Sequence, residues 1–64
     1  MRHTELETRL SEALGDDYAA FWASQTVIAA LDGRTPRQAL DDGVPPKQVW
    51  AAVWETLGLP ASQR

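Results

Sequence analysis

The chain has 64 residues, 44% of them hydrophobic, and its six basic and nine acidic residues give a net charge of −3. A single domain of this length lies near the lower limit for independent folding, and the lack of cysteine excludes disulfides and thiolate metal sites as sources of stability. Residues 1–34 carry three Arg against six acids and residues 35–64 are neutral, so neither half has the basic excess that phosphate binding requires.

The first amphipathic segment predicts a helix over residues 4–14. Thr4 and Glu7 match a capping box, in which the two side chains satisfy free backbone N–H groups. Gly15 follows where a left-handed C-cap is expected. The apolar residues of this segment fall within about 100° of helical arc.

The second segment, Tyr18 to Leu31, has no charge and is the most unusual stretch of the chain. It predicts a helix over residues 17–31, with Asp16 or Asp17 at its N-cap and Gly33 beyond its end. Such a helix is apolar on two faces. Either it is the central helix, covered from both sides, or another chain covers part of it.

Two further helices complete the pattern. Thr35 with Gln38 repeats the capping box around a proline, which predicts a helix over residues 35–42. After a Pro-Pro connector, a helix over residues 46–57 is expected to end at Gly58. The last residues, from about 61, are expected to be frayed.

These segments predict one all-α domain, residues 1–64, built as a compact bundle of four short helices with helix 2 central. The expected core consists of apolar residues from all four segments: Leu6, Leu10, Leu14, Phe21, Ile28, Leu31, Leu40, Trp50, Val53 and Leu57.

Two tryptophans are candidates for an interaction surface. Trp22 lies on the second apolar face of helix 2, and Trp54 lies on the flank of the stripe formed by the last helix. A partly exposed Trp is typical of binding hot spots, whereas a domain this small also needs large side chains in its core. Both interpretations remain open for Trp22 and Trp54, whereas Trp50 is expected in the core.

Three charged residues are expected to form the rim of the same surface. Asp41 and Asp42 end the third helix, where carboxylates oppose the helix dipole, and Arg34 precedes that helix. Capping of the turn at Gly43 explains the two aspartates equally well.

A nucleic-acid-binding alternative rests on Arg34, Arg37 and Lys47, since the third and fourth helices with their short turn resemble a helix-turn-helix. Three basic residues opposed by Asp32, Asp41 and Asp42 predict weak phosphate binding at most.

No residue pattern indicates catalysis, and we expect no enzyme activity, no cofactor and no metal. His3 is the only histidine, and with Glu7 it offers two metal ligands where even catalytic zinc needs three. The N-terminus lacks the apolar segment of a secretory signal, and Tyr18–Leu31 is too short to span a bilayer. We therefore expect a cytoplasmic protein with no membrane contact and no small-molecule substrate.

One family resemblance covers nearly the whole chain. The residues that carry the resemblance are Gly33-Arg34-Thr35, Ala39-Leu40, Gly43, Pro46-Lys47 and the Val49-Trp50 block, together with Met1-Arg2 and the Gly15 to Ala19 junction. On these residues, the chain resembles the small actinobacterial family called domain of unknown function 3046. Family members often have Cys at the position of Trp54, which weakens Trp54 as a candidate for a shared function.

The resemblance implies a helical, cytoplasmic bacterial protein whose gene often lies beside those of a recombinase and its regulator. Together with the surplus of apolar faces, it favours a non-enzymatic protein-interaction module that docks through an apolar patch with Trp22 and Trp54, rimmed by Arg34, Asp41 and Asp42. The partner is expected to be a protein, of the DNA-repair and recombination machinery, or a second copy in a self-assembling oligomer.

Overall fold

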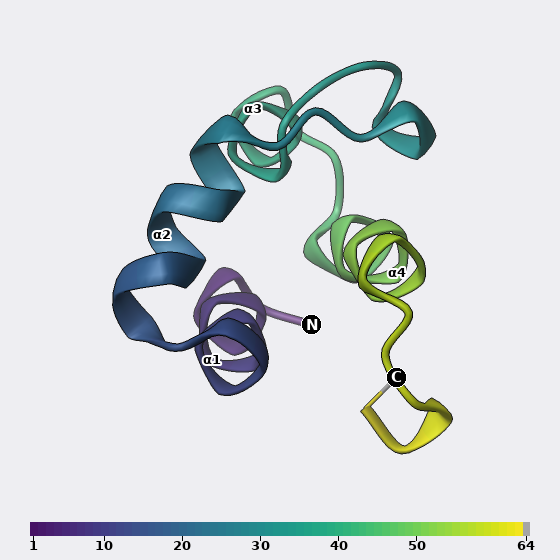
Figure 1. Ribbon diagram of the computed structural model, residues 1–64. Helices are drawn as coiled ribbons and strands as arrows, with labels where there is room; N and C mark the ends of the chain where they lie inside the picture. The colour runs from purple at the N-terminus through teal and green to yellow at the C-terminus, as the bar shows by residue number, and fades with distance from the viewer. Residues whose placement is uncertain (64) are drawn as a thin grey trace.

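The computed structural model describes residues 1–63 and shows an all-α fold, as predicted. Its four helices are α1 (His3–Leu14), α2 (Asp16–Gln25), α3 (Pro36–Asp41) and α4 (Pro46–Leu57), with 3-10 turns η1 (Ala29–Leu31) and η2 (Ala61–Gln63). Helix α2 extends from α1 to α3, and α4 lies across the interior from α2 (Figure 1). Within residues 1–63, no helix has the length and apolar character needed to cross a membrane.

Helix α2 is shorter than the second helix predicted from the sequence. It ends at Gln25, whereas the prediction extends to Leu31. Residues 26–28 are Thr, Val and Ile, a β-branched run that loses side-chain freedom in a helix. The backbone is extended at Thr26 and at Ile28, and Ile28 forms an isolated antiparallel bridge with Arg34. The Ile28 N–H donates to the Arg34 carbonyl at 3.0 Å, and this bond closes a loop around η1.

Ending α2 early decides which apolar residues enter the core. In the loop, Ile28 and Leu31 are both buried, whereas Val27 is 63% exposed. Within α2, the inward face consists of Ala19 and Trp22. Phe21, expected in the core, is instead 62% exposed, because the continuous helical face that would have joined it to Ile28 does not form.

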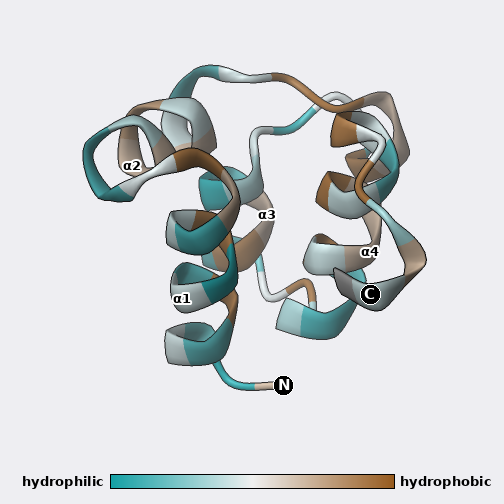
Figure 2. Cartoon of the chain, turned by 60° about the horizontal axis from the view of Figure 1, so that its bottom comes forward, coloured by the Kyte–Doolittle hydropathy of each residue, from teal (hydrophilic) through white to brown (hydrophobic). Residues whose placement is uncertain are grey.

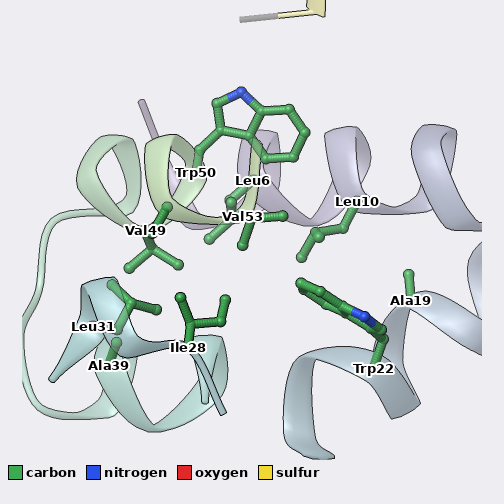
Figure 3. Close-up of a cluster of buried hydrophobic side chains, with 11 residues drawn as sticks. Leu6, Leu10, Ala19, Trp22, Ile28, Leu31, Ala39, Val49, Trp50 and Val53 are labelled. Atoms are coloured by element: carbon green, nitrogen blue, oxygen red, sulfur yellow. The ribbon is translucent and has the colours of Figure 1, made fainter. Parts of the chain in front are cut away.

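The remaining core prediction is confirmed for its central members. The buried members are Leu6, Leu10, Ile28, Leu31, Trp50 and Val53 (Figure 3). The half-buried members, which pack against this cluster, are Leu14, Leu40 and Leu57. The prediction omitted several buried residues, mostly small ones: Ala19, Trp22, Thr35, Pro36, Ala39, Val49 and Ala52.

The expected central place of helix 2 holds only in part. Helix α2 packs against both α1 and α3, but it buries two residues, whereas α4 buries four. All the helices carry hydrophobic and hydrophilic residues side by side, as expected for helices packed around one interior (Figure 2). The outward face of α2 is the exception, because it exposes aromatic side chains.

Helix ends agree with the sequence signals at some positions and differ at others. The Thr35 capping box is present, with the Gln38 N–H donating to Thr35 Oγ1 at 3.1 Å and the Thr35 N–H donating to Gln38 Oε1 at 3.0 Å. The predicted Thr4 box is wrong, because α1 begins at His3 and Thr4 Oγ1 does not cap it. The N-cap of α2 is Gly15, and Asp16 and Asp17 lie in the first turn.

The segment after α4 contains the residues that were expected to be frayed, from about 61. Gly58 has left-handed backbone angles and ends α4, as predicted. The chain then forms η2 over residues 61–63, and Arg64 lies outside the described residues.

Candidate functional site

Trp22, the first candidate for an interaction surface, lies in the core. Its side chain extends from α2 toward the interior with Leu10 and Val53 (Figure 3). The residue is only 8% exposed. Of the two interpretations that the sequence left open, the structure shows packing in the core, so the indole ring of Trp22 is not available to a partner.

Trp54, the second candidate, is half-buried and forms hydrogen bonds with the residues that follow α4. Its indole N–H donates to the Pro60 carbonyl at 2.9 Å, and the Leu59 N–H donates to the Trp54 carbonyl at 3.2 Å. These bonds attach Leu59 and Pro60 to the last turns of α4. Trp54 therefore has a structural role, and the predicted patch of two exposed tryptophans is absent from residues 1–63.

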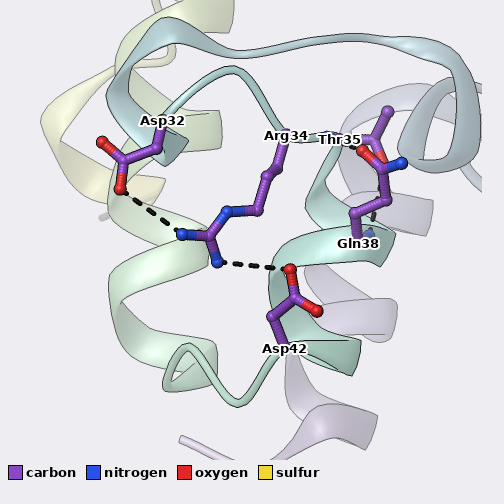
Figure 4. Close-up of polar contacts among 5 residues, drawn as sticks. All are labelled: Asp32, Arg34, Thr35, Gln38 and Asp42. Carbon is purple, nitrogen blue, oxygen red and sulfur yellow. Dashed lines mark hydrogen bonds and ion pairs between the residues drawn. The ribbon is translucent and has the colours of Figure 1, made fainter.

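The predicted charged rim forms a local network of ion pairs. Arg34 lies between two carboxylates, with Nη2 3.4 Å from Asp32 Oδ2 and Nη1 3.4 Å from Asp42 Oδ2 (Figure 4). Arg37 Nε lies 3.6 Å from Asp41 Oδ1, one helical turn away. Arg34 thus connects the loop after η1 to the carboxyl end of α3, where its positive charge offsets the unfavourable position of Asp42.

The same contacts weaken the basic spot of the nucleic-acid alternative. Arg34 and Arg37 both face carboxylates, and Lys47 is exposed in the first turn of α4. Phosphate binding would have to compete with these ion pairs, at a domain whose net charge is already negative.

The most exposed aromatic side chains are Tyr18 and Phe21, which we call the aromatic pair. They are 54% and 62% exposed, and their rings stack with centroids 6.4 Å apart and planes inclined by 29°. The two residues lie one helical turn apart on α2, on the side opposite Ala23. In the helix predicted from the sequence, Tyr18 shares the second apolar face with Trp22, whereas Phe21 lies on the first face and is expected in the core, so the sequence did not predict the pair as one surface.

An apolar groove lies on the other side of α2, between α1, α2 and α3. It encloses about 480 Å³. Apolar lining includes Leu10 from α1, Ala20 and Ala23 from α2, and Leu40 from α3. Glu7 and Asp16 lie along its α1–α2 edge, and Arg37 lies on its α3 edge. No sequence motif pointed to this groove, because it is assembled from three separate helices.

Residues with metal-binding chemistry do not gather in the described part of the chain. Among residues 1–63, no three His, Asp or Glu side chains form a group able to hold a metal ion. His3 is exposed at the first position of α1.

Comparison with known proteins places the chain in a sequence family. The family model described as protein of unknown function (DUF3046) matches residues 1–62. No curated protein and no solved structure matches the chain.

Proposed function

The chain belongs to the DUF3046 family of proteins of unknown function, and from its surface we propose that it is a non-enzymatic module that binds a protein partner through the aromatic pair. The observation that carries the proposal is the exposure of two stacked aromatic rings on one helix of a domain with few large side chains. Burying them in the core would benefit folding, so their exposure calls for a covering partner.

Aromatic side chains give strong binding from a small surface. Each buries up to 150–250 Å² with few rotatable bonds, and Tyr is among the residues enriched at binding hot spots. The aromatic pair alone falls short of the roughly 800 Å² that each partner contributes to a standard interface. The pair is therefore the centre of a larger contact, in which both rings enter a pocket on the partner.

Electrostatics favour a different protein over a second copy of this chain. Asp17 is exposed beside Tyr18, in the first turn of α2. In a two-fold dimer of parallel α2 helices, Asp17 would approach its counterpart. In an antiparallel dimer, Asp17 would approach the negative end of the other helix dipole. A partner with Lys or Arg around an apolar pocket avoids both repulsions.

The class of partner to test first is a protein of the recombination and repair machinery. This choice rests on the gene neighbourhood that the family resemblance implies, and on no residue of the structure. Weak nucleic-acid binding through Arg34, Arg37 and Lys47 remains the alternative function.

The test is capture of partners on the immobilised full-length chain from an actinobacterial lysate, with and without nuclease. The affinity of each purified candidate is then measured by calorimetry against the native chain and Tyr18→Ala/Phe21→Ala. Because truncation of even one hot-spot residue costs about 2 kcal/mol or more, we expect the double variant to bind at least about 30-fold more weakly. Gln48→Ala/Glu55→Ala, at two exposed positions of α4, is the matched control and is expected to bind normally.

Three outcomes would overturn the proposal. Unchanged affinity of the double variant would show that the aromatic pair is not the contact. Retention that disappears with nuclease would indicate nucleic-acid binding instead. The absence of any retained protein would also count against a protein-binding module.

A further inference from the structure

We propose that the groove between α1, α2 and α3 is a second binding site, which takes a short segment of a partner protein with an apolar side chain next to a cationic one. The inference is independent of the proposed function, because the groove and the aromatic pair lie on opposite sides of α2. Each site can exist without the other.

The shape of the groove arises from small side chains on α2. Ala20 and Ala23 present only methyl groups toward it, while Leu10 and Leu40 belong to the flanking helices. A volume of about 480 Å³ lies within the range of sites that bind ligands in proteins. An aliphatic side chain of Leu or Met size fills part of such a space and covers the half-buried Leu40.

The charges around the groove decide what accompanies that apolar side chain. Glu7 from α1 and Asp16 from α2 line the groove, and none of the ion pairs among residues 1–63 includes either carboxylate. Arg37, which lines the groove from α3, is already paired with Asp41. The uncompensated charge at the groove is therefore negative, and the complementary occupant carries Lys or Arg.

The same charges exclude the exposed apolar surface of a second copy as the occupant. The aromatic pair is an exposed apolar feature that another copy could insert, and Asp17 lies beside it. Insertion would bring Asp17 close to Glu7 and Asp16. A heterologous basic segment fits the groove without that repulsion.

The experiment uses two short peptides as probes, acetyl-Leu-Arg-Leu-Arg-amide and its matched counterpart acetyl-Leu-Glu-Leu-Glu-amide. Each is titrated into the ¹⁵N-labelled full chain, and amide shifts are followed by NMR. We expect the Arg peptide to shift the amides of Ala20, Ala23 and Leu40 in a saturable way. The Glu peptide is expected to leave them unchanged.

Two variants test separately how the charge of the groove and its shape contribute to binding of the Arg peptide. Glu7→Gln/Asp16→Asn removes the negative edge and is expected to weaken binding of the Arg peptide about threefold to tenfold, because each surface charge pair contributes little. Ala20→Leu leaves the charges in place but fills the groove, and it is expected to abolish the shifts. Ala51→Leu, at an exposed position of α4, is the matched control for Ala20→Leu.

Binding at the groove can be distinguished from binding at the aromatic pair. Tyr18→Ala/Phe21→Ala is expected to bind the Arg peptide as the native chain does. Equal binding of the two peptides, shifts centred on Tyr18 and Phe21, or normal binding by Ala20→Leu with its helical circular dichroism retained would each refute the groove as a cation-selective site.

Discussion

Trp22 and Phe21 are adjacent in the chain, yet Trp22 lies in the core and Phe21 is 62% exposed. On a helix, neighbouring residues point about 100° apart, and in α2 the direction of Trp22 faces the other helices whereas that of Phe21 faces outward. The inward direction of α2 is set by Ala19 and Trp22 together. Exposure of Phe21 follows from the geometry of a short helix whose other face is already packed.

We predict that truncation of Trp22 destabilises the domain far more than truncation of Phe21 does. Trp22→Ala is expected to lower the free energy of unfolding by about 3–5 kcal/mol, because it leaves a cavity in the core. Phe21→Ala is expected to change it by about 0.5 kcal/mol or less. Urea denaturation followed by circular dichroism measures both. If Trp22→Ala does not fold, Trp22→Phe serves as a milder variant, and comparable losses for Phe21→Ala and Trp22→Ala would contradict the assignment.

At the scale of elements, the ends of the helices depend on backbone conformations that few residues adopt. Gly58 has φ 67° and ψ 35° and ends α4, and its N–H donates to the Glu55 carbonyl at 3.2 Å. A Cβ added at this position would meet nothing within 4 Å. Any cost of a larger residue at Gly58 is therefore conformational and not steric crowding by other elements.

Gly58→Ala is expected to destabilise the domain by about 1 kcal/mol, since an L-residue in the left-handed region costs about 1–2 kcal/mol and restriction of the unfolded chain offsets part of that. The chain is short enough for chemical synthesis, which offers a control of opposite sign. D-alanine at position 58 favours positive φ and is expected to stabilise the domain. Thermal unfolding of the three synthetic chains tests this, and equal destabilisation by both alanines would show that space, not backbone conformation, is limiting.

At the scale of the whole molecule, a short chain forms a core without disulfides, and the acidic excess lies entirely in residues 1–34. Those residues include α1 and α2, where both the aromatic pair and the groove edge with Glu7 and Asp16 are found. The acidic part of the molecule thus coincides with its uncovered apolar surface. This coincidence disfavours contact between two copies and favours a basic partner.

The isolated chain is therefore expected to be monomeric. Its midpoint of thermal unfolding should not change with protein concentration, since coupled dimerisation would raise it at higher concentration. Calorimetric scans over a hundredfold range of concentration, together with sedimentation equilibrium, measure this. A midpoint that rises with concentration, and that stops rising in Tyr18→Ala/Phe21→Ala, would instead identify the aromatic pair as a contact between copies.

The sequence by itself determined the helical fold class, the number of helices, the capping box at Thr35 and the end of α4 at Gly58. These features depend on local chemistry: apolar periodicity, side chains that bond to nearby backbone groups, and glycine with positive φ. Leu6, Leu10, Trp50 and Val53 lie on the apolar faces of α1 and α4 and are buried, as this periodicity predicts. The family resemblance is confirmed over residues 1–62.

Only the tertiary structure decided where α2 ends and which of its apolar faces is covered. Residues 26–31 fit a helix by periodicity, but the bridge between Ile28 and Arg34 buries both Ile28 and Leu31 in a loop, a pairing that local pattern does not encode. The candidate surface moved from Trp22 to Tyr18 and Phe21 for the same reason. The groove between three helices was likewise invisible in the sequence, because its residues become neighbours only when α1, α2 and α3 pack together.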